Sequence, residues 1–393
     1  MSWVGAVSIL IGLLAIPVGV VNRDRRMLAL MILAWAAHIA CAYAYYMYVQ
    51  TQTADTALYY FDPYEMVRMG FATGTLAVLQ FVQAAKALIG GTYLDYFLMF
   101  QVLGVLGIAL MLRSMQEVLG AFGASWSPLM TAMAFMPGTY FWTSAIGKDA
   151  PLFLAVALAG WSAMRLKSRW LWFAIALLIM AAIRPHIALI AAAGLAFAVM
   201  IGRGLPNYAR FGAFVFAAIC LVAVGITVQS SLAIDLSSAG SIANYVDNQV
   251  DSLSTAAGAT DMASMPYFFK LLSLLYRPFF FDYNGIFSLV ASLQNVFMIV
   301  VTYLLARNWR IWRDMFFASI AVRYATFFLF GMILFLTIIY YNVGLGLRQR
   351  EMFTPALFFI VTAVFCHIRV PRSLPHRGPG EHRVTVPERV VSG

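Results

Sequence analysis

Two arginines lie two residues apart in the stretch NVGLGLRQREMF, between two apolar segments of the chain. If this stretch is extended, Arg348 and Arg350 point the same way, because alternate residues of an extended chain share a face. Arginine forms paired hydrogen bonds to phosphate oxygens, and the free amides at the start of a helix attract the same ligand. We therefore predict that Arg348 and Arg350 clamp a diphosphate, with Glu351 as a neighbouring candidate.

Two short turns between apolar runs carry further charges. Arg184 and His186 flank Pro185; arginine suits phosphate recognition, and histidine can act as an acid or a base near neutral pH. The alternative for Arg184 is a side chain that extends to the lipid headgroups. Lys148 can neutralise a phosphate or pair with the adjacent Asp149, whereas Asp149 can instead cap the helix that follows.

Carboxylates gather in the first long loop, where Asp55, Asp62 and Glu65 accompany several tyrosines. Asp62 and Glu65 would share one face of a helix, because residues three apart are neighbours there. Such groups can supply a general base for a hydroxyl nucleophile or bind a divalent cation. The alternative is a solvated loop at the membrane surface. Farther along, Arg277 and Asp282 flank three phenylalanines, and Arg277 can face either an anionic ligand or lipid phosphates.

The composition identifies the elements that must position these charges. Hydrophobic residues make up 63% of the 393-residue chain and charged residues 11%, whereas soluble domains carry roughly 25% charged residues. Apolar runs of about 17–25 residues follow one another, which is the length that crosses a bilayer. The sequence therefore predicts an all-α polytopic integral membrane protein. The basic residues responsible for the net charge of +10 lie in short loops, so nucleic-acid binding is not expected.

About eleven membrane spans are predicted from these runs. They cover residues 3–21, 27–48, 94–112, 126–145, 150–165, 170–185, 187–203, 211–230, 285–306, 316–341 and 352–368. Residues 1–368 then form a single transmembrane domain, and residues 369–393 a disordered cytoplasmic tail. The loops 49–93 and 231–284 are predicted to be extracytoplasmic and to contain interfacial helices.

Lysine and arginine predict the orientation, because cytoplasmic loops are enriched in them. One set of loops, together with the tail, holds 17 of these residues and the opposite set holds 8, so the N-terminus is predicted outside and the C-terminus inside. Eleven of the sixteen acidic residues fall on the outer side. Charges at a membrane boundary are costly unless they are paired or face water, so this outer group is the predicted functional site.

The chain resembles the EpsG-like and Wzy-type polymerases of bacterial exopolysaccharide and O-antigen, in its layout and in four short stretches. These are the early loop with Asp55 and its tyrosines, FWTSAIGKD, RPF at Arg277, and NVGLGLRQR. The resemblance implies polymerisation of undecaprenyl-diphosphate-linked repeat units on the periplasmic face, with arginines at the diphosphate. The acid-bearing first loop looks equally like that of the GT-C glycosyltransferases, which use a polyprenyl-phosphate sugar donor.

The outer charges by themselves fit glycan transfer from a polyprenyl-linked donor, in which cations neutralise the leaving phosphate and an acid or histidine acts on the acceptor hydroxyl. The candidates for catalysis are Asp55, Asp62, Glu65 and His186. The candidates for phosphate binding are Lys148, Arg184, Arg277, Arg348 and Arg350. Asp149, Asp282 and Glu351 are further candidates.

No cofactor is expected, with a divalent metal at the loop carboxylates as the one option. The expected partners are a polyprenyl-linked glycan and the lipids of the bacterial inner membrane, with other polysaccharide-assembly proteins as an option. Two functions of other classes stay open. A transporter or flippase for an anionic solute would use charges through the membrane depth, where Arg323 is the candidate. A non-catalytic assembly subunit would need no clustered outer charges.

Overall fold

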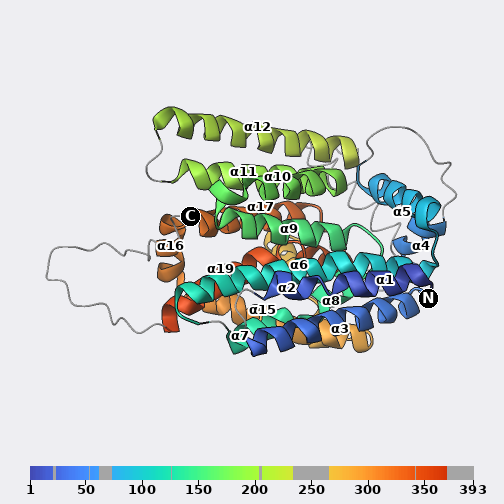
Figure 1. Cartoon of the computed structure of the whole chain (residues 1–393). Coiled ribbons are helices and arrows are strands. Elements are labelled where there is room, and N and C mark those ends of the chain that lie inside the picture. Colours follow the sequence, from blue (N-terminus) through green and yellow to red (C-terminus); the bar gives the residue numbers. More distant parts are fainter. Residues whose placement is uncertain are drawn as a thin grey trace.

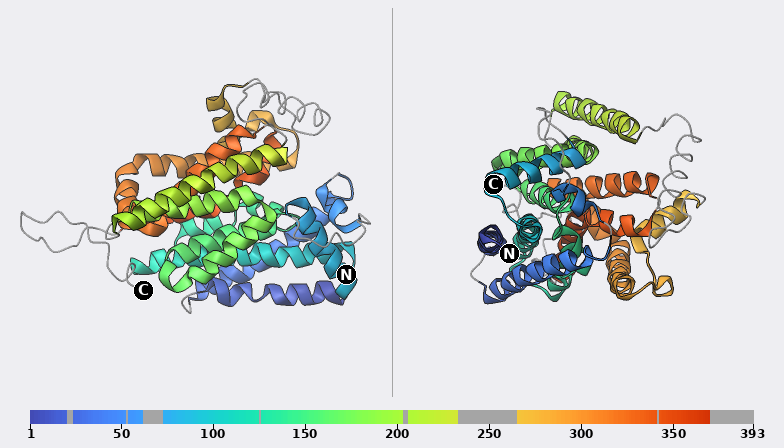
Figure 2. Two further views of the ribbon diagram at one scale, coloured as in Figure 1. Left: turned by 90° about the horizontal axis from the view of Figure 1, so that it is seen from above. Right: turned by 90° about the vertical axis from the view of Figure 1, so that its right-hand side faces the viewer.

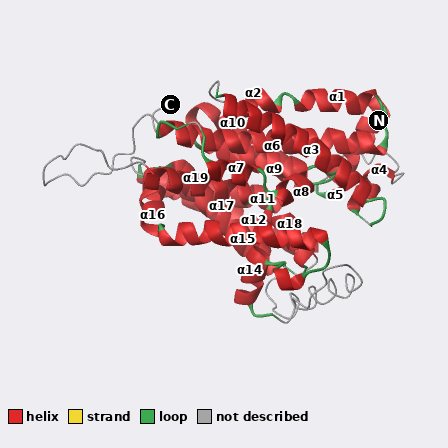
Figure 3. Ribbon diagram, turned by 90° about the horizontal axis from the view of Figure 1, so that it is seen from below, coloured by secondary structure: helices red, strands yellow, loops and turns green. Residues whose placement is uncertain are grey.

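The computed structural model describes residues 1–20, 24–52, 54–61, 73–124, 126–202, 206–232, 265–340 and 342–369. Within these ranges the chain is helical and contains no strand, as Figure 3 shows. The predicted all-α class is therefore confirmed for this part of the chain. Asp62, Glu65, most of the loop 231–284 before residue 265, and the tail from residue 370 lie outside the described residues.

The described helices occur in the following order along the chain. The first half of the chain forms α1 (Trp3–Gly12), α2 (Ala15–Gly19), α3 (Arg25–Tyr48), α4 (Asp55–Phe61), α5 (Thr75–Ile89), α6 (Tyr93–Ala121), α7 (Pro128–Ala134), α8 (Pro137–Thr143), α9 (Asp149–Ala163) and α10 (Leu166–Ile183). The second half forms α11 (Pro185–Met200), α12 (Asn207–Leu232), α14 (Tyr267–Tyr276), the 3-10 turn η1 (Phe280–Asp282), α15 (Ile286–Arg307), α16 (Trp309–Ala318), α17 (Ile320–Ile338), α18 (Val343–Arg350) and α19 (Thr354–Arg369).

In the part of the chain that the structure describes, five helices are long and apolar enough to cross a membrane: α3, α6, α10, α15 and α17. The pair α18 and α19 makes a sixth if its two helices, bent by 56°, count as one span. Most of the remaining predicted spans correspond to shorter apolar helices, among them Trp3–Gly19, α9 and α11. The chain therefore has the elements of a membrane protein.

The predicted span 126–145 is not continuous. The chain instead forms two seven-residue helices, α7 and α8, with a break at Phe135 and Met136. Met136 adopts extended backbone angles, because the ring of the next residue, Pro137, disfavours the helical conformation before it. Pro137 then starts α8, where its missing N–H costs nothing.

The long helices run between two ends of the bundle, which we call the α4 end and the α16 end (Figures 1 and 2). The α4 end holds the N-terminus, α4 and α5, and the α16 end holds the connection between α15 and α17. Exposed apolar side chains cover much of α12 and α15, including Phe211, Phe214, Leu293 and Val296. In water such surfaces would be costly, whereas lipid tails accept them.

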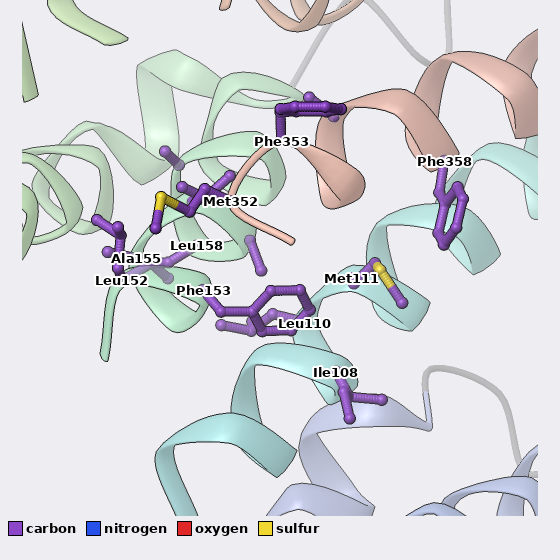
Figure 4. Packing of buried hydrophobic residues seen from close by; sticks show 14 of the residues in the cluster. Ile108, Leu110, Met111, Leu152, Phe153, Ala155, Leu158, Met352, Phe353 and Phe358 are labelled. Carbon is purple, nitrogen blue, oxygen red and sulfur yellow. The ribbon is translucent and has the colours of Figure 1, made fainter. Parts of the chain in front are cut away.

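Helix α6 is the centre of the bundle and packs against α1, α2, α3, α9 and α19. Figure 4 shows part of this core, where Ile108 and Met111 of α6 lie near Phe153 of α9 and Phe358 of α19. Gly104 of α6 allows the closest approach, since a Cβ atom there would collide with the Thr143 carbonyl and the His38 ring. This contact fixes the end of α8, and therefore the turn that follows it.

A buried carboxylate ties three helices together at the far end of α6. Both oxygens of Glu117 accept hydrogen bonds from Arg169 Nη2 at 3.0 Å, and one of them also accepts from Trp161 Nε1 at 2.9 Å. Arg113 and Arg165 lie 3.5 and 3.9 Å from the same carboxylate. We call this group the Glu117 hub. It joins α6, α9 and α10 near the C-terminal end of α6.

Candidate functional site

Charged residues from four distant stretches meet at the α4 end. Asp55 begins α4, Lys148 and Asp149 lie at the start of α9, Arg184 connects α10 to α11, and Arg348 lies in α18. We call these five residues the charged cluster. Asp55 and Arg348 are 293 positions apart in the sequence, so only the packing of the helices brings them together.

Arg348 is the link between the two carboxylates of the charged cluster. Its Nε donates a hydrogen bond to Oδ2 of Asp149, and its Nη1 lies 3.4 Å from Oδ2 of Asp55. The two acids differ in access to solvent, because the side chain of Asp149 is 8% exposed and that of Asp55 is 61% exposed. Asp149 therefore orients the arginine from within, whereas Asp55 remains free to contact a ligand from outside.

Arg184 faces the same buried acid without a close bond. Its Nη2 lies 4.0 Å from Oδ1 of Asp149, and this oxygen has no hydrogen-bond partner among the described residues. The Arg184 side chain is largely buried. Its guanidinium donors are therefore held in place by the packing of α10 and α11, and they are available to a ligand.

Lys148 points toward α5 rather than toward its neighbour Asp149. Its Nζ donates a hydrogen bond of 2.8 Å to Oγ1 of Thr75, so the predicted local ion pair is wrong. Asp149 also does not cap α9 through its side chain. Burial lowers the pKa of Lys148, and the positive charges of Arg184 and Arg348 lower it further. Because an added anion would relieve this repulsion, the lysine favours a negatively charged ligand.

Two features of the surroundings shape the charged cluster. Burial raises the pKa of Tyr59 to about 12, with a further contribution from Asp55, so its hydroxyl is neutral at physiological pH. Gly147 has φ of +156°, a region that favours glycine, and it sets the direction in which Lys148 leaves the turn. With all groups ionised, three cations meet two carboxylates, and the surplus positive charge is suited to phosphate.

Arg350 is not part of the charged cluster, so the predicted clamp by Arg348 and Arg350 is wrong. The segment is a helix, started by Asn342, whose side chain accepts hydrogen bonds from the amides of Gly344 and Leu345. Residues two apart on a helix point in different directions. Arg350 accordingly turns into the bundle, where it is 1% exposed and donates to the Leu275 carbonyl at 2.7 Å.

Glu351 is also buried, and its hydrogen bonds join helices. Its Oε2 accepts from Oγ1 of Thr139 at 2.5 Å, and its Oε1 accepts from Nε2 of Gln294 at 3.0 Å. Gln294 in turn accepts from the Gly138 amide at 2.8 Å. These bonds connect the bend between α18 and α19 to α8 and α15. They therefore fix the C-terminal end of α18, the helix that carries Arg348.

His186 lies beside the charged cluster, near Arg184 and Lys148. Its ring packs against Phe335 with a centroid distance of 4.7 Å, and its Nε2 is buried with no partner among the described residues. Of the four predicted catalytic residues, Asp55 and His186 are therefore placed near the phosphate-binding candidates. Asp62 and Glu65 lie outside the described residues, within which no three His, Cys, Asp or Glu side chains form a metal-binding group.

Arg277 and Asp282 form an ion pair with each other instead of joining the charged cluster. Arg277 Nη2 lies 2.5 Å from Asp282 Oδ1 and its Nε 3.1 Å from Oδ2, while the Phe279 amide donates to the same carboxylate at 2.8 Å. Arg277 is therefore used to close the turn after α14. The structure therefore does not bring Arg277 together with the other predicted phosphate-binding residues, and its prediction as such a residue stays untested.

We expect Asp282→Asn to lower the unfolding free energy by about 1.5–3 kcal/mol near pH 7, since it removes charge-assisted hydrogen bonds. Arg277 holds the pKa of Asp282 below its ordinary value of 3.8. Asp282 therefore contributes its full stabilisation of the folded state above pH 3.8, the ordinary pKa of the unfolded chain. This stabilisation is lost as the pH falls through the lower pKa that Asp282 has in the folded state. Thermal unfolding of detergent-solubilised protein should show the two proteins converging in acid. A difference that persists unchanged at pH 3 would contradict this assignment.

No protein-family model, curated protein or solved structure matches the chain. The assignment of the charged cluster as a candidate site therefore rests on the structure of this chain alone. Three stretches that carry the sequence resemblance contribute to it, through Asp55, through Lys148 and Asp149, and through Arg348. The three cysteines, Cys41, Cys220 and Cys366, are free.

Proposed function

We propose that this protein is a membrane glycosyltransferase that transfers glycan from a polyprenyl-diphosphate-linked donor to an acceptor glycan, in surface polysaccharide assembly. The observation that carries the proposal is the charged cluster itself: one open carboxylate beside three cations, at one end of a bundle of membrane-length helices. A polyprenyl-linked glycan places its phosphates at such a boundary, with its lipid in the bilayer and its sugars in water.

The residues divide into two roles in this reaction. Lys148, Arg184 and Arg348 neutralise the diphosphate, whose negative charge grows as it leaves with the electrons of the broken bond. Asp55 accepts the proton of the acceptor hydroxyl as its oxygen bonds to the anomeric carbon. Asp55 suits this role because it is exposed and, within the described part of the chain, pairs with Arg348 alone, so an incoming hydroxyl can reach it.

The same assignment places the charged cluster on the periplasmic side of a bacterial inner membrane. The arginines of the Glu117 hub lie at the opposite end and would face the cytoplasm. The N-out and C-in topology would follow if the shorter apolar helices also cross the membrane. Arg323 offers no support for a transporter, because its guanidinium donates to the carbonyls of Ala198, Phe316 and Phe317.

Lys148→Ala and Arg184→Ala should each weaken the binding of undecaprenyl diphosphate by at least ~10-fold, about 1.4 kcal/mol, because each removes one cation from the phosphates. Asp55→Asn should leave this binding within about twofold while abolishing glycan transfer, since the amide cannot take a proton. Native mass spectrometry of the protein in nanodiscs measures the binding. Polymer formation in cells that depend on the gene measures the transfer.

Undecaprenyl monophosphate and undecaprenol serve as matched ligands in the same experiment. Tighter binding of the diphosphate supports a diphosphate donor, and equal binding of both phosphates supports the monophosphate alternative. Arg313→Ala is the control variant, because Arg313 is an exposed arginine at the α16 end that pairs with Asp314. Undecaprenol binding as tightly as both phosphates would overturn the proposal.

A further inference from the structure

A group of four aromatic rings lies next to the charged cluster, and the reaction steps above do not use it. Tyr48 ends α3, Phe141 and Trp142 lie in α8, and Phe287 lies near the start of α15. The ring centroids of neighbours are 5.2–5.8 Å apart, from Phe141 to Trp142, Phe141 to Phe287, Tyr48 to Phe287 and Tyr48 to Phe141. We call these four residues the aromatic shelf.

Tyr45 and helix α8 extend the aromatic shelf toward the charged cluster. The ring centroid of Tyr45 is 4.5 Å from that of Phe141 and 6.0 Å from that of Trp142. Helix α8, which carries Phe141 and Trp142, packs against α9 and α18, the helices that hold Asp149 and Arg348. A ligand bound by its phosphate to Arg348 would therefore extend its next group over the aromatic shelf.

The aromatic shelf keeps both ring surface and polar edges available. Phe287 is 58% exposed, and Tyr48, Phe141 and Trp142 are half-buried. The Tyr48 hydroxyl and the Trp142 indole N–H make no hydrogen bond to any described residue. Elsewhere in the bundle, indole N–H groups in half-buried positions are bonded: those of Trp35, Trp126, Trp161 and Trp312 each donate to a protein oxygen. Trp142 therefore holds an unused donor at the edge of the site.

This combination fits a sugar better than a lipid chain. Aromatic rings offer a large apolar face, and Tyr and Trp add a polar edge that finds a partner when water is excluded. A pyranose ring presents apolar C–H groups on its face and hydroxyls on its rim, so it uses both parts of the aromatic shelf. A prenyl chain would use only the faces and would bury the Trp142 N–H without a partner, which is costly.

We propose that the aromatic shelf binds the sugar ring attached directly to the donor diphosphate, with Trp142 as its main contact. This inference rests on the proposed function and adds the part of the substrate that the charged cluster does not recognise. It assigns the diphosphate to Lys148, Arg184 and Arg348, and the first sugar to the rings beyond Tyr45.

The test compares two lipids that differ only by the sugar, undecaprenyl diphosphate and undecaprenyl-diphosphate-N-acetylglucosamine, by native mass spectrometry in nanodiscs. The wild type should bind the sugar-bearing lipid at least ~10-fold more tightly. Trp142→Leu should remove this preference and leave the bare lipid unchanged. Trp142→Phe keeps a ring but loses the N–H, so it should retain part of the preference. Trp170→Leu, at an exposed tryptophan on α10 away from the aromatic shelf, is the control.

The outcomes separate this inference from the function on which it rests. Equal weakening of both lipids by Trp142→Leu would show that the aromatic shelf holds the prenyl chain, and it would overturn the sugar site alone. Equal binding of both lipids by the wild type would also overturn the sugar site while leaving the phosphate site intact. Failure of both lipids to bind more tightly than undecaprenol would overturn the proposed function as well. The thermal midpoint of each variant establishes that it is folded.

Discussion

Replacing Arg348 with alanine is expected to abolish the proposed glycan transfer and to destabilise the α4 end of the protein. Among the described residues, the substitution removes the one guanidinium that contacts both Asp55 and Asp149. It also leaves the carboxylate of Asp149 buried, with Arg184 at 4.0 Å as its nearest remaining cation. Breaking a buried pair from one side costs about 3–5 kcal/mol, so a loss of this order in the unfolding free energy is expected.

A second variant separates the loss of stability from the loss of function. In the double variant Arg348→Met with Asp149→Asn, no buried carboxylate is left without its close partner, while Arg184 loses its acid at 4.0 Å, so folding should recover in part. Transfer should stay absent, because the diphosphate has still lost a ligand. Thermal unfolding measures the first effect and polymer length in cells the second. Polymer of normal length from the folded double variant would contradict the assigned role of Arg348.

Replacing Glu117 with alanine is expected to give the largest loss of stability at the α16 end. Arg169 would lose both of its carboxylate bonds while remaining largely buried, and Arg113 and Arg165 would repel it without compensation. The expected cost is again about 3–5 kcal/mol. Glu117→Gln should be milder, because an amide oxygen can still accept from Trp161.

The Glu117 variants are measured by thermal midpoint and by the yield of monodisperse protein in detergent. Folded Glu117→Gln protein should bind undecaprenyl diphosphate like the wild type, since the Glu117 hub lies at the end of α6 opposite to the charged cluster. Asp314→Ala is the matched control, because that acid makes an exposed pair with Arg313. A Glu117→Ala protein as stable as the wild type would show that the three arginines need no counter-charge.

The apolar runs of the sequence predict the long helices well, because a bilayer-length run has few other ways to satisfy its backbone. The spans predicted at 27–48 and 285–306 correspond closely to α3 and α15. The sequence does indicate the break within the predicted span 126–145, because Pro137 disfavours the helical conformation of the residue before it. A prediction of spans from hydropathy misses this break, since the residues on both sides of it are apolar.

The members of the charged cluster were also recognisable, because charges at a membrane boundary are rare. Their partners were not, since the pairing of Asp55 with Arg348 depends on packing between distant helices. The sequence predicts that Arg348 and Arg350 share a face of an extended segment, whereas the Asn342 cap starts a helix on which Arg350 turns into the bundle. Glu117 was missed because a lone acid near basic loops carries no local signal. Trp142 lies within the stretch FWTSAIGKD, but the grouping of the aromatic rings around it depends on packing between distant helices.

The order of synthesis gives the bond between Asp149 and Arg348 a further consequence. The two residues are 199 positions apart, so the ribosome adds Arg348 roughly 10–40 s after Asp149 at about 5–20 residues per second. During that interval the acid at the start of α9 has no final partner. The nascent chain therefore depends on water, lipid headgroups or the insertion machinery to tolerate Asp149, and a chain that stops before α18 never completes the site.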